Sequence, residues 1–226
     1  MARELGDLPS VAFALGTAAQ VDQITRAVQT ALEMAEAAIS MADKEGLAYF
    51  ASHGRIVKGW ALAQLGHAEE GVSQIREGLT MASARGEEMI WRTYNLAQLA
   101  EACGAAGRIS DGLAVTAEAL GLVHQNGETW WEAGIHRLRA ELLLKQNCAN
   151  SLEPQVSLER AIEIARRQGA KSLELRATTS LARLLRDTRR RDEARVLLVE
   201  IYNWFTEGFD TTDLKDAKDL LDELSS

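Results

Sequence analysis

Histidine and cysteine are among the residue types that could bind a metal ion or act as nucleophiles, and both are scarce in this sequence. The 226-residue chain has two cysteines and four dispersed histidines, with no HExxH motif and no His/Cys cluster. Cys103 and Cys148 lie in helical patterns, where reduced, inert thiols are the simplest interpretation. We therefore predict no metal site and no cofactor.

Carboxylate spacing gives no stronger indication of catalysis. Glu128, Glu132 and Glu141 could be paired for acid–base chemistry, but solvated helix faces produce the same spacings. The sequence also lacks the GxxxxGK[ST] loop that would cradle a phosphate group. We therefore predict that this chain is not an enzyme.

The composition favours an all-helical protein, because Ala, Leu, Glu and Arg are abundant and only two prolines occur. The formal net charge of −8 argues against non-specific nucleic-acid binding. There is no signal peptide, and no apolar run approaches the roughly 20 residues that span a bilayer. We expect a cytoplasmic protein with neither a nucleic-acid nor a membrane partner.

Four segments share one pattern, in which Ala or Gly is followed by an aliphatic residue and a glycine closes the segment eight positions later. They are AISMADKEG, GLTMASARG, ALGLVHQNG and AIEIARRQG, ending at Gly46, Gly86, Gly127 and Gly169. These glycines are 40, 41 and 42 residues apart. A glycine suits the left-handed cap that ends a helix, and four caps in phase predict a repeat.

A second marker is a pair of small residues 12 positions apart, which lets two successive helices approach closely. The pairs are Gly59 and Gly71, Ala100 and Gly112, and Ala182 and Ala194. In the repeat between the last two pairs the spacing is 14, from Ala140 to Pro154. Each repeat is therefore predicted to be a hairpin of two closely packed helices.

This pattern resembles the tetratricopeptide repeat, a helix-turn-helix unit of about 34 residues that is lengthened here to 40–42. We predict an all-α, right-handed superhelical array that forms one domain over residues 1–226. Its five hairpins are expected at about 8–45, 47–85, 87–126, 128–168 and 170–207. A helix over 211–224, with one apolar stripe and an acidic outer face, is predicted to cap the array.

The first helices of the hairpins carry two stripes of side chains. Phe50, Trp91 and Trp131 occupy matching positions and are predicted to pack inside the hairpins. Residues next to them are rotated by about 100° and would line the concave face of the array. This second stripe is the candidate partner-binding groove, although an ordinary solvated face explains it equally well. Its residues are Tyr49, His53, Trp60, Tyr94, Glu101, Trp130, Arg137, Glu141, Lys145, Arg176, Arg183 and Arg186.

Charge is unevenly distributed near the C-terminus. Residues 166–195 contain ten Lys/Arg against four Asp/Glu, whereas residues 207–223 contain seven acids and two lysines. We expect the acidic cap to neutralise part of the basic hairpin. An external anionic partner, such as an acidic peptide or a nucleotide phosphate, would have to compete with the cap.

Three strings resemble the C-terminal repeat region of large bacterial signalling proteins that join a class III adenylate/guanylate cyclase domain to an AAA-like or STAND-type ATPase. They are GETWWEAGIHRLRAELLL (127–144), ERAIEIARRQGAKSLELRATTSLARLLRD (159–187) and FTEGFDTTDLKDAKDLLDEL (205–224). The resemblance implies a regulatory or scaffolding tail, with cyclase or ATPase chemistry in an upstream region. Met1 lies just before the first predicted helix, as in a piece excised from a longer protein.

Two functions stay open on the sequence alone. One is a protein-interaction module that binds a peptide or another domain, within or between molecules, in the concave groove. The other is a ligand-sensing superhelix, in which a small molecule regulates an attached ATPase or cyclase. The sequence shows a stripe rather than a closed pocket with converging polar groups, which favours the first function.

Overall fold

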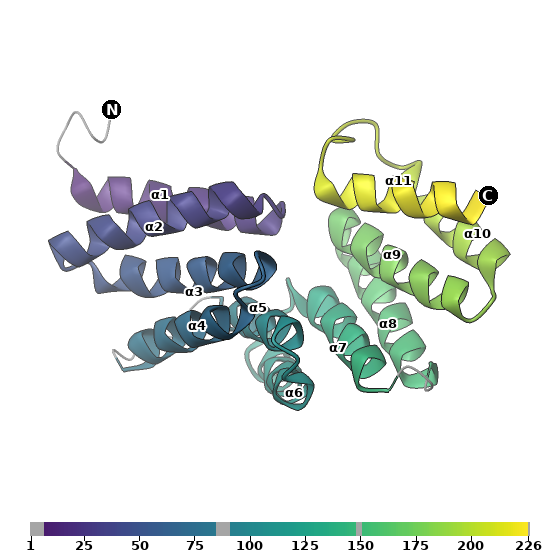
Figure 1. The fold of residues 1–226 in the computed structure, drawn as a ribbon, viewed down its shortest axis with the longest axis horizontal. Coiled ribbons are helices and arrows are strands. Elements are labelled where there is room, and N and C mark those ends of the chain that lie inside the picture. Colours follow the sequence, from purple (N-terminus) through teal and green to yellow (C-terminus); the bar gives the residue numbers. More distant parts are fainter. Residues whose placement is uncertain (1–6, 85–90, 148–150, 226) are drawn as a thin grey trace. The chain divides into compact units, whose positions relative to one another are not determined.

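The computed structural model describes residues 7–84, 91–147 and 151–225, and every helix or strand element in these ranges is an α-helix (Figure 1). The predicted all-α fold is therefore confirmed. The chain divides into two compact units, an N-terminal unit of residues 1–112 and a C-terminal unit of residues 113–226. Within the described ranges, no helix is both long enough and apolar enough to cross a bilayer.

The N-terminal unit is built from helical hairpins. Its helices are α1 (Leu8–Ile24), α2 (Val28–Glu45), α3 (Ala48–Gln64), α4 (Ala68–Ser83) and α5 (Arg92–Ala105), followed by the start of α6 (Ile109–Asn126). From α1 to α5 each helix packs against the next, and α3 also packs against both α1 and α5 (Figure 1). The first helices of successive hairpins therefore form one continuous layer.

The C-terminal unit repeats this arrangement. After the remainder of α6 it contains α7 (Glu132–Gln146), α8 (Leu152–Gln168), α9 (Lys171–Asp187), α10 (Arg191–Tyr202) and α11 (Thr212–Ser225). From α7 to α11 each helix packs against the next, and α9 also contacts both α7 and α11. The helix α11 therefore packs against α9 and α10 as the first helix of a further hairpin would.

The C-terminal helix covers the last hairpin, as the apolar stripe predicts. All five residues of that stripe are buried against α9 and α10, namely Leu214, Ala217, Leu220, Leu221 and Leu224. The same core cluster includes Leu181, Leu185 and Leu198 from the hairpin beneath. The predicted capping helix is therefore confirmed, and it spans Thr212–Ser225.

The glycine spacing correctly identifies helix ends. Gly46 and Gly169 cap α2 and α8 with φ of 68° and 67°, and Gly127 follows α6 with φ of 69°. This left-handed region penalises any residue with a Cβ. Gly86, the remaining glycine of the series, lies outside the described residues.

The small-residue pairs mark points where helix backbones nearly touch. A Cβ added to Gly59 in α3 would lie 2.6 Å from the carbonyl oxygen of Gly71 in α4, closer than real Cβ atoms come. The alanines of the other pairs, Ala100, Ala182 and Ala194, are completely buried. The small side chains are thus contact points between packed helices.

Two helices are shorter than the sequence predicts. The helix expected to run to residue 207 ends at Tyr202, where Asn203, a weaker helix former, becomes the C-cap, and Gly208 further on has φ of 76°. The helix expected from residue 128 begins at Glu132, with Trp131 as its N-cap. The predicted boundary between the 47–85 and 87–126 hairpins lies outside the described residues.

Candidate functional site

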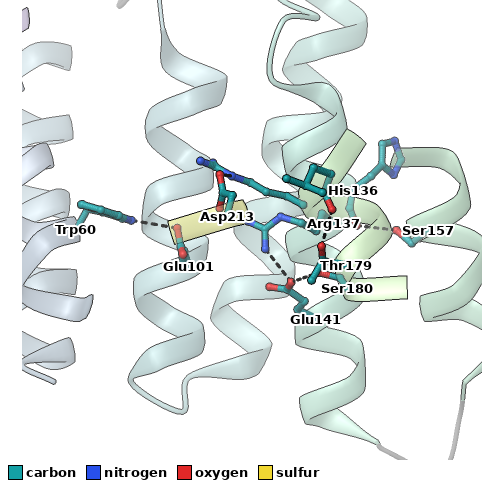
Figure 2. A network of polar contacts seen from close by, with 11 residues as sticks. Trp60, Glu101, His136, Arg137, Glu141, Ser157, Thr179, Ser180 and Asp213 are labelled. Atoms are coloured by element: carbon teal, nitrogen blue, oxygen red, sulfur yellow. Dashed lines mark hydrogen bonds and ion pairs between the residues drawn. The ribbon is translucent and has the colours of Figure 1, made fainter. Parts of the chain in front are cut away.

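Two of the side chains predicted to line the partner-binding groove are buried inside the N-terminal unit. Trp60 is 2% exposed, and its indole nitrogen donates a hydrogen bond to the Glu101 carboxylate at 3.1 Å (Figure 2). Tyr94 is 1% exposed, and its hydroxyl donates to Oε1 of Gln23 at 2.8 Å. The prediction that Trp60 and Tyr94 line an exposed groove is therefore wrong. The first helices pack directly on each other and enclose large side chains at these positions.

These contacts tie the first helices of the N-terminal unit together. The bond from Trp60 to Glu101 joins α3 to α5 over 41 residues, the length of one repeat. The bond from Tyr94 to Gln23 joins α5 to α1. Gln20 and Gln23 are both buried, and neither side-chain nitrogen has a hydrogen-bond partner. Neither glutamine was predicted from the sequence, although Gln20 lies 40 residues before Trp60 and so shares its repeat position.

Aromatic side chains gather at the beginning of α3. Tyr49 is exposed and packs edge-on against Phe50 with ring centroids 5.3 Å apart. Phe50 in turn contacts the exposed ring of Phe13 from α1 at 6.4 Å. One turn further along α3, burial lowers the pKa of His53 from 6.5 to about 4. The His53 side chain is therefore neutral at physiological pH and adds no charge to this aromatic patch.

A polar network connects α7 with α9 in the C-terminal unit. Arg137 and Ser180 both donate to Oε1 of Glu141, each at 2.7 Å (Figure 2). Burial alone would raise the pKa of Glu141, but the charge of Arg137, the two hydrogen bonds and the charge of Arg183 outweigh it and lower the pKa. Arg183 and Lys145 are exposed on α9 and α7. The carboxylate thus stays ionised within a predominantly basic face.

Two adjacent tryptophans precede α7 and differ in exposure. Trp130 is 37% exposed, whereas Trp131 is 8% exposed, and its indole nitrogen would lie 2.6 Å from a Cβ added to Gly134. The predicted burial of Trp131 and exposure of Trp130 are confirmed. The same reasoning is wrong for Trp91, which is 37% exposed. Trp91 is the N-cap of α5, and its ring lies edge-on to Tyr94 with centroids 6.3 Å apart.

The capping helix engages two arginines of the predicted groove. Arg176 pairs with Asp213 at 2.6 Å, and both side chains are only 12% exposed. Arg186 pairs with Glu223 at 2.8 Å. The expected neutralisation of the basic hairpin by the cap is therefore confirmed for these pairs. These ion pairs also correct the prediction that Arg176 and Arg186 are available to bind a partner in the groove.

Burial sets the ionisation of the cysteine and of a second histidine among the described residues. Cys103 is buried, and burial raises the pKa of its thiol, which therefore stays protonated and unreactive. Cys148 lies outside the described residues. Burial also lowers the pKa of His136 to about 4, assisted by nearby cationic side chains. Within the described ranges no three His, Cys, Asp or Glu residues are grouped closely enough to hold a metal ion.

Comparison with known proteins begins from sequence. No protein-family model matches the chain. An uncharacterized protein of Rhizobium meliloti (strain 1021) is 27% identical over 164 residues, which are 72% of this chain. The chain covers only 15% of the length of that relative.

Solved structures decide the fold. Two crystal structures of TPR-like repeats from a putative kinesin light chain of Podosopora anserina superpose with TM-scores of 0.58 and 0.57. Each covers 85% of this chain, and the matches span 93% and 94% of those chains. The fold is a tetratricopeptide-like repeat. At 18% sequence identity the likeness concerns the fold alone.

Proposed function

We propose that this chain is a non-catalytic protein-interaction module that binds an acidic peptide segment or domain on the α7–α9 face. The face comprises Trp130, Arg137, Glu141, Lys145 and Arg183. The observation that carries the proposal is the exposed indole of Trp130 beside a buried tryptophan neighbour. Aromatic and arginine side chains contribute most of the binding energy at protein interfaces.

The charge of this face supports an acidic partner. Arg137, Lys145 and Arg183 provide three cations, against the carboxylate of Glu141 and that of Glu128, which accepts a hydrogen bond from the Trp130 indole. Arg137 donates a hydrogen bond to Glu141, so its guanidinium is already oriented before a partner binds. A partner carboxylate could then pair with Arg183 while an apolar side chain packs on Trp130.

The wider context we propose is a bacterial signalling protein in which this repeat region regulates or positions an upstream catalytic domain of the cyclase or ATPase type. Support comes from the three strings that resemble such proteins. It also comes from the R. meliloti relative, in which the matching segment is a small part of a much longer chain. Under this proposal the acidic partner belongs either to the same polypeptide or to another component of the signalling system.

Selection of a displayed peptide library against the full chain tests the proposal. Enriched peptides should combine Asp or Glu with a neighbouring apolar residue. Trp130→Ala should weaken a selected peptide about 30-fold, the equivalent of about 2 kcal/mol at an interface anchor. Arg183→Ala should weaken it about fivefold and reduce its salt dependence.

Trp204→Ala is the matched control, because Trp204 is also exposed but follows α10 and packs on Phe205. That variant should bind the selected peptide as the unmodified chain does. Equal losses from Trp130→Ala and Trp204→Ala would show that the α7–α9 face is not the binding surface.

A further inference from the structure

A groove of about 400 Å³ lies among α8, α9 and α10. Its apolar lining includes Ile162, Leu181 and Leu185, which are buried, and Leu197, which is half-buried. Small-molecule sites in proteins have volumes of roughly 300–1,000 Å³ and are mostly apolar with a few placed polar groups. In size and lining, this groove is therefore suited to a small molecule.

One polar side chain in the groove has no partner of its own. Thr178 lines the groove and is 1% exposed, yet its hydroxyl forms no hydrogen bond. The adjacent Thr179 hydroxyl instead donates to the carbonyl of Leu175 within the same helix. A buried hydroxyl without a partner is unfavourable, so a polar ligand atom that bonds to it would stabilise the complex.

The charged side chains that line the groove itself are mostly acidic. Glu159, Glu163 and Glu193 stand against Arg166, so these four lining residues have a net charge of −2. Glu163 is paired with Arg160 and Glu193 with Arg190, both at 2.7 Å and largely exposed. Exposed pairs of this kind contribute little to stability, so a cationic ligand could replace the arginines as the partner of these glutamates.

We propose that this groove binds a small organic amine: an apolar body packs on the leucines, a polar atom meets Thr178, and the ammonium group lies among the glutamates. The groove and the α7–α9 face proposed for protein binding both use α9, but they share no residue, so they are separate sites. It adds a small-molecule ligand to the proposed function without depending on it.

Three probes with the same apolar body and different charge test the site: 4-phenylbutylamine, 4-phenylbutyrate and 4-phenylbutanol. Methyl NMR of the full chain should show that the amine shifts Ile162, Leu181, Leu185 and Leu197 with saturation in the millimolar range. The butyrate should bind at least tenfold more weakly than the amine, and the alcohol should lie between them. Glu163→Gln combined with Glu193→Gln should remove most of the preference for the amine.

Thr178→Val and Thr179→Val form the matched pair of variants. Removal of the Thr178 hydroxyl should weaken amine binding about fivefold, the equivalent of one hydrogen bond, while the folded state keeps its stability. Thr179→Val should leave amine binding unchanged, because that hydroxyl is bonded within α9. Absence of amine binding at these methyl groups, or equal binding of the amine and the butyrate, would overturn the proposal. Equal effects of the two threonine variants would overturn the role of Thr178.

Discussion

Replacement of Gly59 with alanine tests the close approach of α3 and α4. The new Cβ would lie 2.6 Å from the carbonyl oxygen of Gly71 and 2.9 Å from the amide nitrogen of Ile75. Both are backbone atoms, so relief requires the two helices to separate rather than a side chain to rotate. Overpacking of this kind costs about 3 kcal/mol. Alanine is about 1 kcal/mol better than glycine inside a helix. We therefore expect Gly59→Ala to lower the free energy of unfolding by about 2 kcal/mol.

Gly121 in α6 supplies the control, because a Cβ at that position would meet nothing within 4 Å. Only the helix-propensity gain remains there, so Gly121→Ala should raise the free energy of unfolding by about 0.5–1 kcal/mol. Urea unfolding followed by far-UV circular dichroism measures both changes with the full chain. The packing argument is refuted if Gly59→Ala is as stable as the unmodified protein, or if the two variants shift stability in the same direction.

Three further outcomes are expected. Trp131→Ala should lower the free energy of unfolding by about 3 kcal/mol and Trp130→Ala by less than about 1 kcal/mol, as thermal or urea unfolding would show. Deletion of residues 210–226 should uncover the apolar surface of the α9–α10 hairpin and cause aggregation or a lower Tm; a monomeric product with unchanged Tm would contradict the capping role of α11. Because burial lowers the pKa of His53 to about 4, the unfolded chain binds a proton there before the folded chain does. Its stability contribution should be complete above pH 6.5 and decline by up to about 3 kcal/mol as the pH falls to 4, a decline that His53→Asn should reduce.

Helix ends and hairpin contacts were predictable from the sequence because each depends on a local property of one residue. Gly46 and Gly169 adopt a backbone conformation that favours glycine, and Gly59 faces a backbone atom, so spacing alone reveals them. Trp130 and Trp131 were correctly predicted to differ in exposure, but the angular offset used for that prediction does not apply, because α7 begins only at Glu132.

Burial between helices was less predictable, because a helical wheel gives a direction but not the neighbour that lies in that direction. Trp60 and Tyr94 have the angular positions of a groove stripe, yet the adjacent first helices cover both side chains. Opposite charge in the cap and the last hairpin predicted attraction, but not that Arg176 in particular would pair with Asp213. The sequence does not distinguish Thr178 from other threonines, because whether its hydroxyl has a hydrogen-bond partner depends on its surroundings in the folded chain.

The hydrogen bond from Tyr94 to Gln23 has a consequence for folding kinetics. It joins residues 71 positions apart, whereas the hairpins of this unit form through contacts between helices that are adjacent in sequence. Local contacts form early and give fast folding, while long loops must close before distant contacts can form. Tyr94→Phe should therefore accelerate unfolding and leave the folding rate nearly unchanged, because the lost bond is absent from the transition state. This buried hydrogen bond would then slow the unfolding of the N-terminal unit and have little effect on its folding rate.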